Sequence, residues 1–372
     1  MNAFKKNDNP TQRFGYLDAA RGIAACMVMC YHYVGWKYPE KLSVKLFHFI
    51  FNGSDAVSFF FVLSGFVLAF PYLQGNKKLD VGKFYINRIF RIYPAFLIAL
   101  LLNSLYWMRH DLMQSPLSTL YHLLIENNSQ FWEEALLIKG RSKFLGLDWT
   151  LTVEMVMSFF IPFLISMVFK NKRLIIWFVF STFLMSNLLG IYVLPFALGM
   201  LVSVYFKEIQ SPEFKQTKWY RFRLIILISA VLMYSIRHID AIFPLGGSLK
   251  YLLNLFQLDF FVFTAIASFV FLVFIIHSRK AQQFLEHPIL LFLGKISYGI
   301  YLLHWVIVSA IYDYWVRIVS CFPNEKIAFL VMMVVCSALT IITATALHYL
   351  VEIPFINKGK RYTMKWKPTI EI

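Results

Sequence analysis

The stretch GSDAVSFFFVLSGFVLAFPYL, residues 53–73, decides the fold class of this chain. Asp55 is the only charged side chain within it. An α-helix rises 1.5 Å per residue, so a run of about 20 apolar residues crosses the hydrocarbon core of a bilayer. The stretch therefore predicts a transmembrane helix.

The composition of the whole chain points the same way. Of the 372 residues, 59% are hydrophobic and 15% are charged, whereas soluble globular proteins have about 45–50% and about 25%. Soluble domains would lack the polar side chains needed to cover their surfaces, so a polytopic membrane protein is predicted. The net charge of +16 favours basic membrane loops over a nucleic-acid partner, because Lys and Arg fall in short clusters between apolar runs.

We expect ten transmembrane helices in one all-α integral membrane domain that occupies residues 1–372. Each crossing needs about 20 apolar residues. The expected spans are 17–36, 54–73, 92–108, 149–169, 174–189, 191–206, 224–239, 250–277, 296–316 and 327–350. A cytoplasmic tail at 351–372 follows, and no appended soluble domain is expected. Any chemistry therefore belongs to the helix bundle.

The distribution of basic residues predicts that both termini are cytoplasmic. With the N-terminus inside, 25 of the 36 Lys and Arg residues fall on the inner side of the ten-span arrangement and 11 on the outer side. Treating the apolar run at 174–206 as one span would reverse every later loop and leave 16 inside and 20 outside. Inner loops carry an excess of Lys and Arg, which favours ten spans.

The first span carries three ionisable side chains that are costly in lipid and therefore candidates for function. Arg21 and His32 are eleven residues apart, so they share a helix face roughly 16 Å apart along the axis. Asp18 lies one turn before Arg21 and can pair with it. His32 is a natural general base. The alternative is a boundary Asp–Arg pair with an interfacial histidine.

The next two spans supply candidates that also have plain structural explanations. Asp55 lies near the outer end of the second span, where a carboxylate could simply cap the helix. Ser64 lies at mid-span beside Gly65, a pair typical of close helix packing. At the start of the third span, Arg88 and Arg91 are three residues apart and point the same way. They are either positive-inside anchors or a clamp for phosphate.

Glu154 and His304 complete the candidate set. Glu154 lies about five residues inside the fourth span, at the depth of His32, and a buried carboxylate needs a partner. We therefore expect Glu154 to pair with His32, with a structural role for Glu154 as the alternative. His304 lies about halfway across the ninth span and could equally be a core histidine. The four cysteines form no Cys-x-x-Cys motif, and no metal site is expected.

Six stretches together resemble the acyltransferase family 3 membrane proteins, which include O-acetyltransferases of bacterial surface carbohydrates. They are LDAARGIAACMVMCYHY (17–33), GSDAVSFFFVLSGF (53–66), NRIFRIYP (87–94), WTLTVEM (149–155), SYGIYLLH (297–304) and HYLVEIPF (348–355). The stretches occur in the family order and cover nearly the whole chain. The resemblance implies transfer of an acyl group, most often acetyl, from cytosolic acyl-CoA to an extracytoplasmic carbohydrate hydroxyl such as one on O-antigen, capsule or exopolysaccharide. It also implies a bacterial inner membrane.

Residue by residue, the resemblance implies that Arg21 and His32 are essential. It places Arg88 and Arg91 on the donor side and Glu154 in the active site. We expect the two donor-side arginines to hold the CoA phosphates with help from Arg21. His32 then acts as general base on the acceptor hydroxyl, or transiently carries the acyl group, while Glu154 orients its ring. The supporting candidates are Asp18, Asp55, Ser64 and His304.

Two other classes of function fit parts of the pattern. A transporter or flippase could relay protons through intramembrane charged residues, but transporters often carry internal repeats, and no repeat relates the two halves of this sequence. A non-catalytic membrane protein that binds sugar or lipid is the second alternative. CoA release that depends on an added acceptor distinguishes an enzyme from both.

Overall fold

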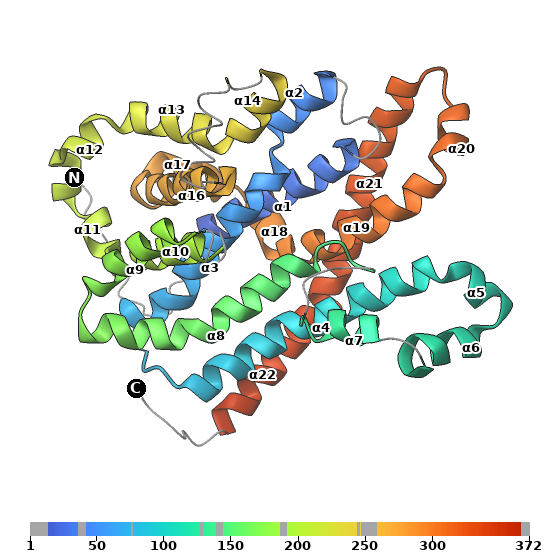
Figure 1. The fold of residues 1–372 in the computed structure, drawn as a ribbon, viewed down its shortest axis with the longest axis horizontal. Helices are drawn as coiled ribbons and strands as arrows, with labels where there is room; N and C mark the ends of the chain where they lie inside the picture. The colour runs from blue at the N-terminus through green and yellow to red at the C-terminus, as the bar shows by residue number, and fades with distance from the viewer. Residues whose placement is uncertain are drawn as a thin grey trace.

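The computed structural model describes residues 14–35, 42–75, 77–126, 129–138, 144–186, 192–243, 246 and 259–365. Throughout these ranges the chain folds into helices and short connections, without a β-strand, as the composition predicts. The helices pack as one bundle, and the first helix contacts helices from the last third of the chain (Figure 1).

The helices vary widely in length. In the first half they are α1 (Gly15–Gly35), α2 (Leu42–Ile50), α3 (Gly53–Leu73), α4 (Val81–Trp107), α5 (Arg109–Gln114), α6 (Pro116–Tyr121), the π-helix η1 (His122–Glu126), α7 (Ser129–Ala135), α8 (Asp148–Lys170) and α9 (Leu174–Leu184). The second half holds α10 (Val193–Val204), α11 (Phe206–Gln210), the 3-10 helix η2 (Pro212–Gln216), α12 (Lys218–Arg221), α13 (Arg223–Tyr234), α14 (Ile236–Ile242), α16 (Phe260–His277), α17 (Arg279–Leu285), α18 (Pro288–Lys295), α19 (Ser297–Asp313), α20 (Trp315–Ser320), α21 (Glu325–Leu347), the π-helix η3 (His348–Glu352) and α22 (Ile353–Lys365).

Among the described residues, five helices are long and apolar enough to cross a membrane. They are Lys45–Leu73, Val81–Trp107, Asp148–Lys170, Phe260–His277 and Glu325–Lys365. Two pairs of helices raise the number to seven if each pair counts as one span. The chain bends by 59° between α13 and α14 and by 69° between α18 and α19. The membrane class is supported, whereas the expected ten spans and cytoplasmic termini are not confirmed.

The apolar run at 174–206 forms two short helices rather than two full spans. α9 and α10 contain 11 and 12 residues, or about 16–18 Å each, which is roughly half of the ~30 Å hydrocarbon core. They pack together through Val179 and Phe183 on α9 and Leu194 and Leu198 on α10. The break in this run that the basic-residue distribution favours is therefore present, but each helix is too short to cross the bilayer alone.

Helix α4 begins eleven residues before the expected third span at 92–108. Asp80 caps it, because the Asp80 side chain accepts a hydrogen bond from the backbone N–H of Lys83 at 3.0 Å. Such a cap satisfies one of the free N–H groups at a helix start. The early start places Arg88 and Arg91 two to three turns inside the helix instead of at its boundary.

Helix α3 lies at the centre of the bundle and packs most closely against α10. A Cβ atom added at Gly65 would collide with the backbone of Phe196, and one added at Gly199 would collide with the backbone of Val62. The absence of side chains at these glycines lets the two backbones approach directly. This confirms the close helix packing that the Ser64–Gly65 pair predicts.

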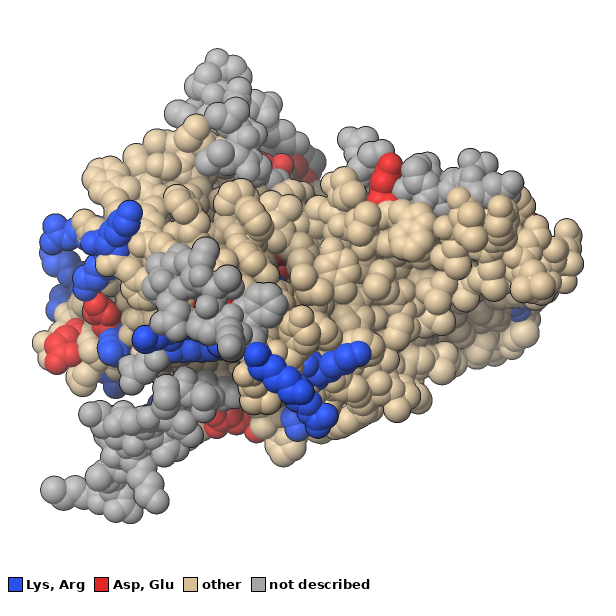
Figure 2. Space-filling view, turned by 90° about the horizontal axis from the view of Figure 1, so that it is seen from below, with Lys and Arg blue, Asp and Glu red and all other residues tan. Residues whose placement is uncertain are grey.

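The outward-facing surfaces of several long helices are apolar. Phe159 and Phe163 on α8, Leu224 and Ile228 on α13, and Val334 on α21 are all exposed. Figure 2 shows a face that is mostly uncharged, with Lys and Arg side chains gathered toward one side. Soluble proteins rarely expose apolar patches of this extent, whereas lipid tails accept them without penalty. The helix surfaces are therefore those of a protein embedded in a bilayer.

Candidate active site

Two histidines from distant parts of the sequence form the centre of the site. His32 lies near the end of α1 and His304 lies within α19, and Nδ1 of His32 is 2.9 Å from Nε2 of His304. Their rings stack with 14° between the planes. His304 is completely buried, whereas His32 is partly accessible. Nδ1 of His304 lies 3.0 Å from the carbonyl oxygen of Ile300.

These contacts fix the protons of the neutral pair. A carbonyl oxygen can only accept a hydrogen bond, so Nδ1 of His304 carries a proton and donates to Ile300. Nε2 of His304 then has a lone pair and accepts a hydrogen bond from Nδ1 of His32. The proton of His32 therefore lies on Nδ1, and its Nε2 keeps a lone pair that no described residue engages. A histidine held in this way through one nitrogen is arranged to accept a proton at the other.

Glu154 does not pair with His32, contrary to the prediction. Its Oε1 atom lies 2.5 Å from Nη2 of Arg88, in a salt bridge that joins α8 to α4. The early start of α4 brings Arg88 to the depth of Glu154, so the carboxylate has a cationic partner close at hand. The imidazole of His32 is instead held by the imidazole of His304.

Arginines give the site a positive region. Asp18 and Arg21 form the predicted ion pair, with 3.1 Å between Oδ1 and Nη1. Arg91 lies within electrostatic range of Arg21, Arg88 and Glu154, its side chain is exposed, and it forms no ion pair with a described residue. Of the two arginines expected to act as a clamp, Arg88 is already paired and Arg91 is available to an anion.

Lysines add positive charge near the start of α4. Lys77 lies just before this helix, Lys83 lies in its first turn, and Lys360 lies on α22, which packs against α4. Partial burial and the ammonium groups of Lys360 and Lys83 lower the pKa of Lys77. The lysines are therefore close enough to repel one another, and a bound anion would relieve that repulsion.

One face of α19 connects the arginines to the histidine pair. Tyr298, Tyr301 and His304 are three residues apart, so they rise along one face over about 9 Å. The Tyr298 hydroxyl donates to the carbonyl of Ile92 on α4 at 2.9 Å, and the Tyr301 hydroxyl lies 2.8 Å from Oγ1 of Thr150 on α8. Neither tyrosine is among the candidates predicted from the sequence. The spacing of three residues between the polar side chains of SYGIYLLH could have identified them, because it places all of these side chains on one helix face.

The stretch HYLVEIPF also lies near this region. Nδ1 of His348 is 2.8 Å from Oε2 of Glu352, within the π-helix η3. Single π-helical turns within long helices often occur at functional sites. Tyr298 lies within electrostatic range of both Glu352 and Glu154, which places η3 beside the α4–α8 ion pair.

Two supporting candidates lie outside the histidine pair. Ser64 is half-buried in α3, and no described residue forms a hydrogen bond with its hydroxyl. Asp55 belongs to a separate polar cluster at the start of α3. The part of the chain that the structure describes contains no group of three or more His, Cys, Asp or Glu side chains able to hold a metal ion.

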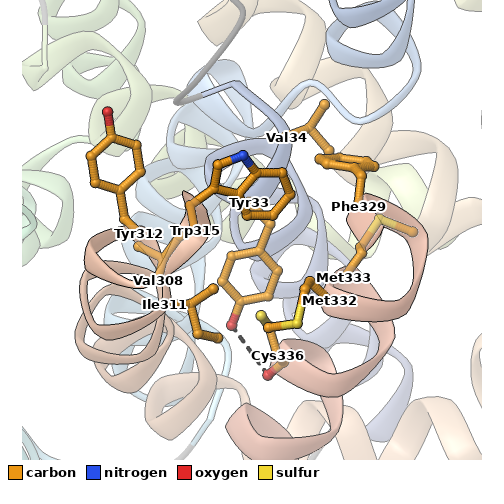
Figure 3. A pocket seen from close by; sticks show the side chains of 10 residues that line it. All are labelled: Tyr33, Val34, Val308, Ile311, Tyr312, Trp315, Phe329, Met332, Met333 and Cys336. Atoms are coloured by element: carbon orange, nitrogen blue, oxygen red, sulfur yellow. Dashed lines mark hydrogen bonds between the residues drawn. The ribbon is translucent and has the colours of Figure 1, made fainter. Parts of the chain in front are cut away.

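Two apolar hollows flank the bundle. A small pocket lies between α1, α19, α20 and α21, where Tyr33 donates a hydrogen bond to the carbonyl of Cys336 at 3.3 Å (Figure 3). A larger cavity of about 1190 Å³ lies between α9, α10, α13 and α16, and its lining includes Lys215, Arg223 and Lys280. Neither hollow includes a residue of the histidine pair or of the Arg88–Glu154 bridge.

The sequence that forms this site matches a known protein family. The acyltransferase domain of acyltransferase family 3 matches residues 14–349. The chain belongs to this family. The match includes the histidine pair, the α4 arginines, Glu154 and the start of HYLVEIPF, so every stretch on which the resemblance rests lies wholly or partly within it. No solved structure matches the chain.

Curated relatives share this similarity at low identity. A Staphylococcus aureus (strain COL) protein, provisionally named an O-acetyltransferase, is 22% identical over 95% of this chain and 59% of its own length. Protein 2 in the picA locus of Rhizobium radiobacter is 31% identical over 40% of this chain and 72% of its own length. Acyltransferase MdmB of Streptomyces mycarofaciens is 35% identical over 24% of this chain and 23% of its own length. The chain thus spans about three fifths of the staphylococcal relative.

Proposed function

We propose that the chain is a membrane O-acyltransferase that moves an acyl group, acetyl in the first instance, from cytosolic acyl-CoA to a hydroxyl of an extracytoplasmic carbohydrate. O-antigen, capsule and exopolysaccharide at a bacterial inner membrane are the acceptors to examine first. The observation that carries the proposal is the His32–His304 pair, which leaves a free imidazole nitrogen inside an apolar helix bundle. The names of the relatives support the acyl group.

The proposed reaction uses the proton positions of the His32–His304 pair. Nε2 of His32 removes the proton of the acceptor hydroxyl while the hydroxyl oxygen attacks the thioester carbonyl. The tetrahedral intermediate then collapses, the carbon–sulfur bond breaks, and the protonated His32 returns its proton to the CoA thiolate. The products are an ester and CoA thiol. His304 keeps the ring of His32 in the required orientation through both proton transfers.

The acyl-CoA donor binds at the positive region near the start of α4. Arg91 contacts a CoA phosphate, because its guanidinium is exposed and unpaired among the described residues. Arg21 adds positive charge nearby. The Arg88–Glu154 bridge fixes α4 against α8, so that Arg91 is held in place. The pantetheine arm then follows the α19 face past Tyr298 and Tyr301 to His32.

The test uses the full chain purified and reconstituted in nanodiscs. CoA thiol release from acetyl-CoA is measured with and without bacterial glycans, and the glycans are then analysed for new esters. We expect release that requires the acceptor and matches the ester formed. Acyl donors of other lengths are tested in parallel. Acceptor-independent movement of substrate across vesicles, with no ester from any donor, would favour a transporter and overturn the proposal.

A further inference from the structure

A second polar cluster contacts Tyr31, the residue that precedes His32 in the sequence. We call it the Asp55 cluster; its members are His48, Asn52, Asp55, Arg237 and His238, from α2, the α3 start and α14. Tyr31 links it to the histidine pair. The Tyr31 ring is 4.1 Å from the ring of His48, 6.1 Å from that of His238 and 5.5 Å from that of His32.

Part of the cluster is a fixed hydrogen-bonded frame. The Asn52 amide donates to the carbonyl of Tyr234 at 2.7 Å, at the bend between α13 and α14. Its Oδ1 atom accepts the backbone N–H of Asp55 at 3.2 Å and lies 2.8 Å from Nε2 of His238. Because an amide oxygen can only accept, Nε2 of His238 carries a proton. Asn52 and His238 are both buried, so the frame is held in place before any ligand arrives.

The carboxylate of Asp55 forms no hydrogen bond with a described residue. The Asp55 side chain is 0% exposed. Nη2 of Arg237 and Nε2 of His238 each lie 3.8 Å from a carboxylate oxygen of Asp55. Nε2 of His48 is likewise buried, and no residue in the described part of the chain forms a hydrogen bond with it. Buried polar atoms without partners are rare and point to a missing ligand or water.

Helix capping does not explain Asp55. A carboxylate in the first turn can stabilise a helix by accepting hydrogen bonds from the free N–H groups or by interacting with the helix dipole. Here Asn52 provides the cap of α3, and Asp55 is removed from solvent. Burial of a carboxylate is costly, and the contacts of Asp55 to Arg237 and His238, both 3.8 Å long, are too long to be hydrogen bonds that would offset this cost, so its oxygens still need donors.

The hydrogen-bonding groups and charges of the Asp55 cluster favour a neutral ligand with several hydroxyl groups. The two Asp55 oxygens need donors, and His48 offers a third buried polar atom. Asp55 repels anions and Arg237 repels cations, whereas sugar hydroxyls donate and accept hydrogen bonds and carry no charge. Tyr31 offers an aromatic face to the apolar side of a sugar ring. Arg237, 41% exposed, connects the buried carboxylate to the surface.

We propose that the Asp55 cluster binds the acceptor sugar: Asp55 accepts hydrogen bonds from two hydroxyls, and a further hydroxyl is presented to Nε2 of His32. This inference rests on the proposed acyl transfer. It assigns sugar recognition to α2, α3 and α14, and separates it from the donor region at the start of α4.

The test measures sugar binding and transfer in the same preparation. The probes are methyl glucoside, methyl galactoside and N-acetylglucosamine, added to the full chain in nanodiscs. Saturation-transfer NMR detects binding, and radiolabelled acetyl-CoA reports transfer. Asp55→Asn keeps the shape of the side chain and removes its charge; Asp313→Asn, which changes the half-exposed carboxylate that bonds Tyr106 and Arg109, is the matched control. His32→Ala removes the proposed base and leaves the cluster intact.

We expect at least one probe to bind wild type and His32→Ala alike. Loss of a charge-assisted hydrogen bond should raise the acceptor KM of Asp55→Asn by about 10- to 100-fold, with the acyl-CoA KM unchanged. Asp313→Asn should match wild type. Unchanged sugar binding and acceptor KM in folded Asp55→Asn, or no binding of any probe to wild type, would overturn the inference. Sugar binding without transfer from any donor would instead contradict the proposed function.

Discussion

The proposed catalytic base, His32, has an uncharged partner in His304. In a Ser-His-Asp triad a buried carboxylate orients the histidine and stabilises its cation. Here His304 supplies the orientation through a neutral nitrogen, and the carbonyl of Ile300 fixes its proton. A buried imidazole costs less to desolvate than a buried carboxylate. The arrangement therefore gives a well-oriented base with less stabilisation of its protonated form.

Substitution of His304 tests this orientation. His304→Leu removes the acceptor for Nδ1 of His32 and should lower kcat by about 10²-fold or more, with little change in the acyl-CoA KM. His304→Gln keeps a side-chain acceptor and should retain much more activity than His304→Leu. Steady-state kinetics of both variants provide the measurement. Equal loss in the two variants would show that His304 acts only through packing.

Arg91 tests the donor side. Arg91→Ala should raise the KM for acetyl-CoA by about 10- to 100-fold, because a hydrogen-bonded charge pair with phosphate is lost. The KM for acetyl-pantetheine, which lacks the nucleotide phosphates, should be the same in wild type and variant. Arg317→Ala, at an exposed arginine on α20, is the control. An equal effect of Arg91→Ala on both donors would refute the phosphate contact.

Among the helices, the early start of α4 is what allows Arg88 to pair with Glu154 on α8. With Asp80 as its N-cap, α4 begins eleven residues before the apolar run. Arg88 therefore lies within the helix and forms a salt bridge with Glu154 on α8. The bridge is largely buried, so removal of one partner leaves a charge in an apolar setting. The pair is thus expected to contribute to helix position as well as to charge balance.

A double-mutant cycle measures that contribution. Arg88→Met should lower the free energy of unfolding by about 1.5–3 kcal/mol, because Glu154 then lacks its charged partner. The double variant Arg88→Met with Glu154→Met should recover much of this loss, since no unpaired charge remains. Thermal unfolding in nanodiscs reports the difference. Additive losses in the two single variants would mean that the bridge has no coupling energy.

The contact between α3 and α10 offers a prediction about packing. In Gly65→Ala the new methyl group meets the backbone of Phe196, and the strain should cost about 1–3 kcal/mol. Gly246→Ala is the control, because a Cβ there meets no atom of a described residue within 4 Å. The melting temperature of Gly65→Ala should fall while that of the control stays near wild type. No fall in Gly65→Ala would contradict the close approach of the two helices.

The sequence predicts the helical class and several local contacts, but it does not predict where α4 begins or which spans become neighbours. The helical membrane class, the Asp18–Arg21 pair and the close packing at Gly65 all follow from local spacing and apolar runs. The Glu154 partner did not, because apolar runs do not reveal how far a polar-capped helix such as α4 extends. The partner of His32 lies 272 positions away, and single-span patterns carry no information about which spans become neighbours.

At the scale of the whole molecule, the two proposed substrate regions lie on different parts of one bundle. Arg91, Arg21 and the lysines give a positive region near the start of α4, and the Asp55 cluster lies at the start of α3 beside α14. The histidine pair lies between these regions in the proposed reaction, and α19 connects it to the donor side. That both termini are cytoplasmic stays a prediction, which reporter fusions at either end can test.

The most direct test of the central claim is transfer of radiolabelled acetyl from acetyl-CoA to glycan by the purified chain, compared with His32→Ala. Acetyl-CoA binding and thermal stability of both proteins are measured in parallel. If His32 is the base, we expect label in the glycan with wild type and none above background with His32→Ala, while the variant remains folded and still binds acetyl-CoA. Transfer by His32→Ala at the wild-type rate would contradict it.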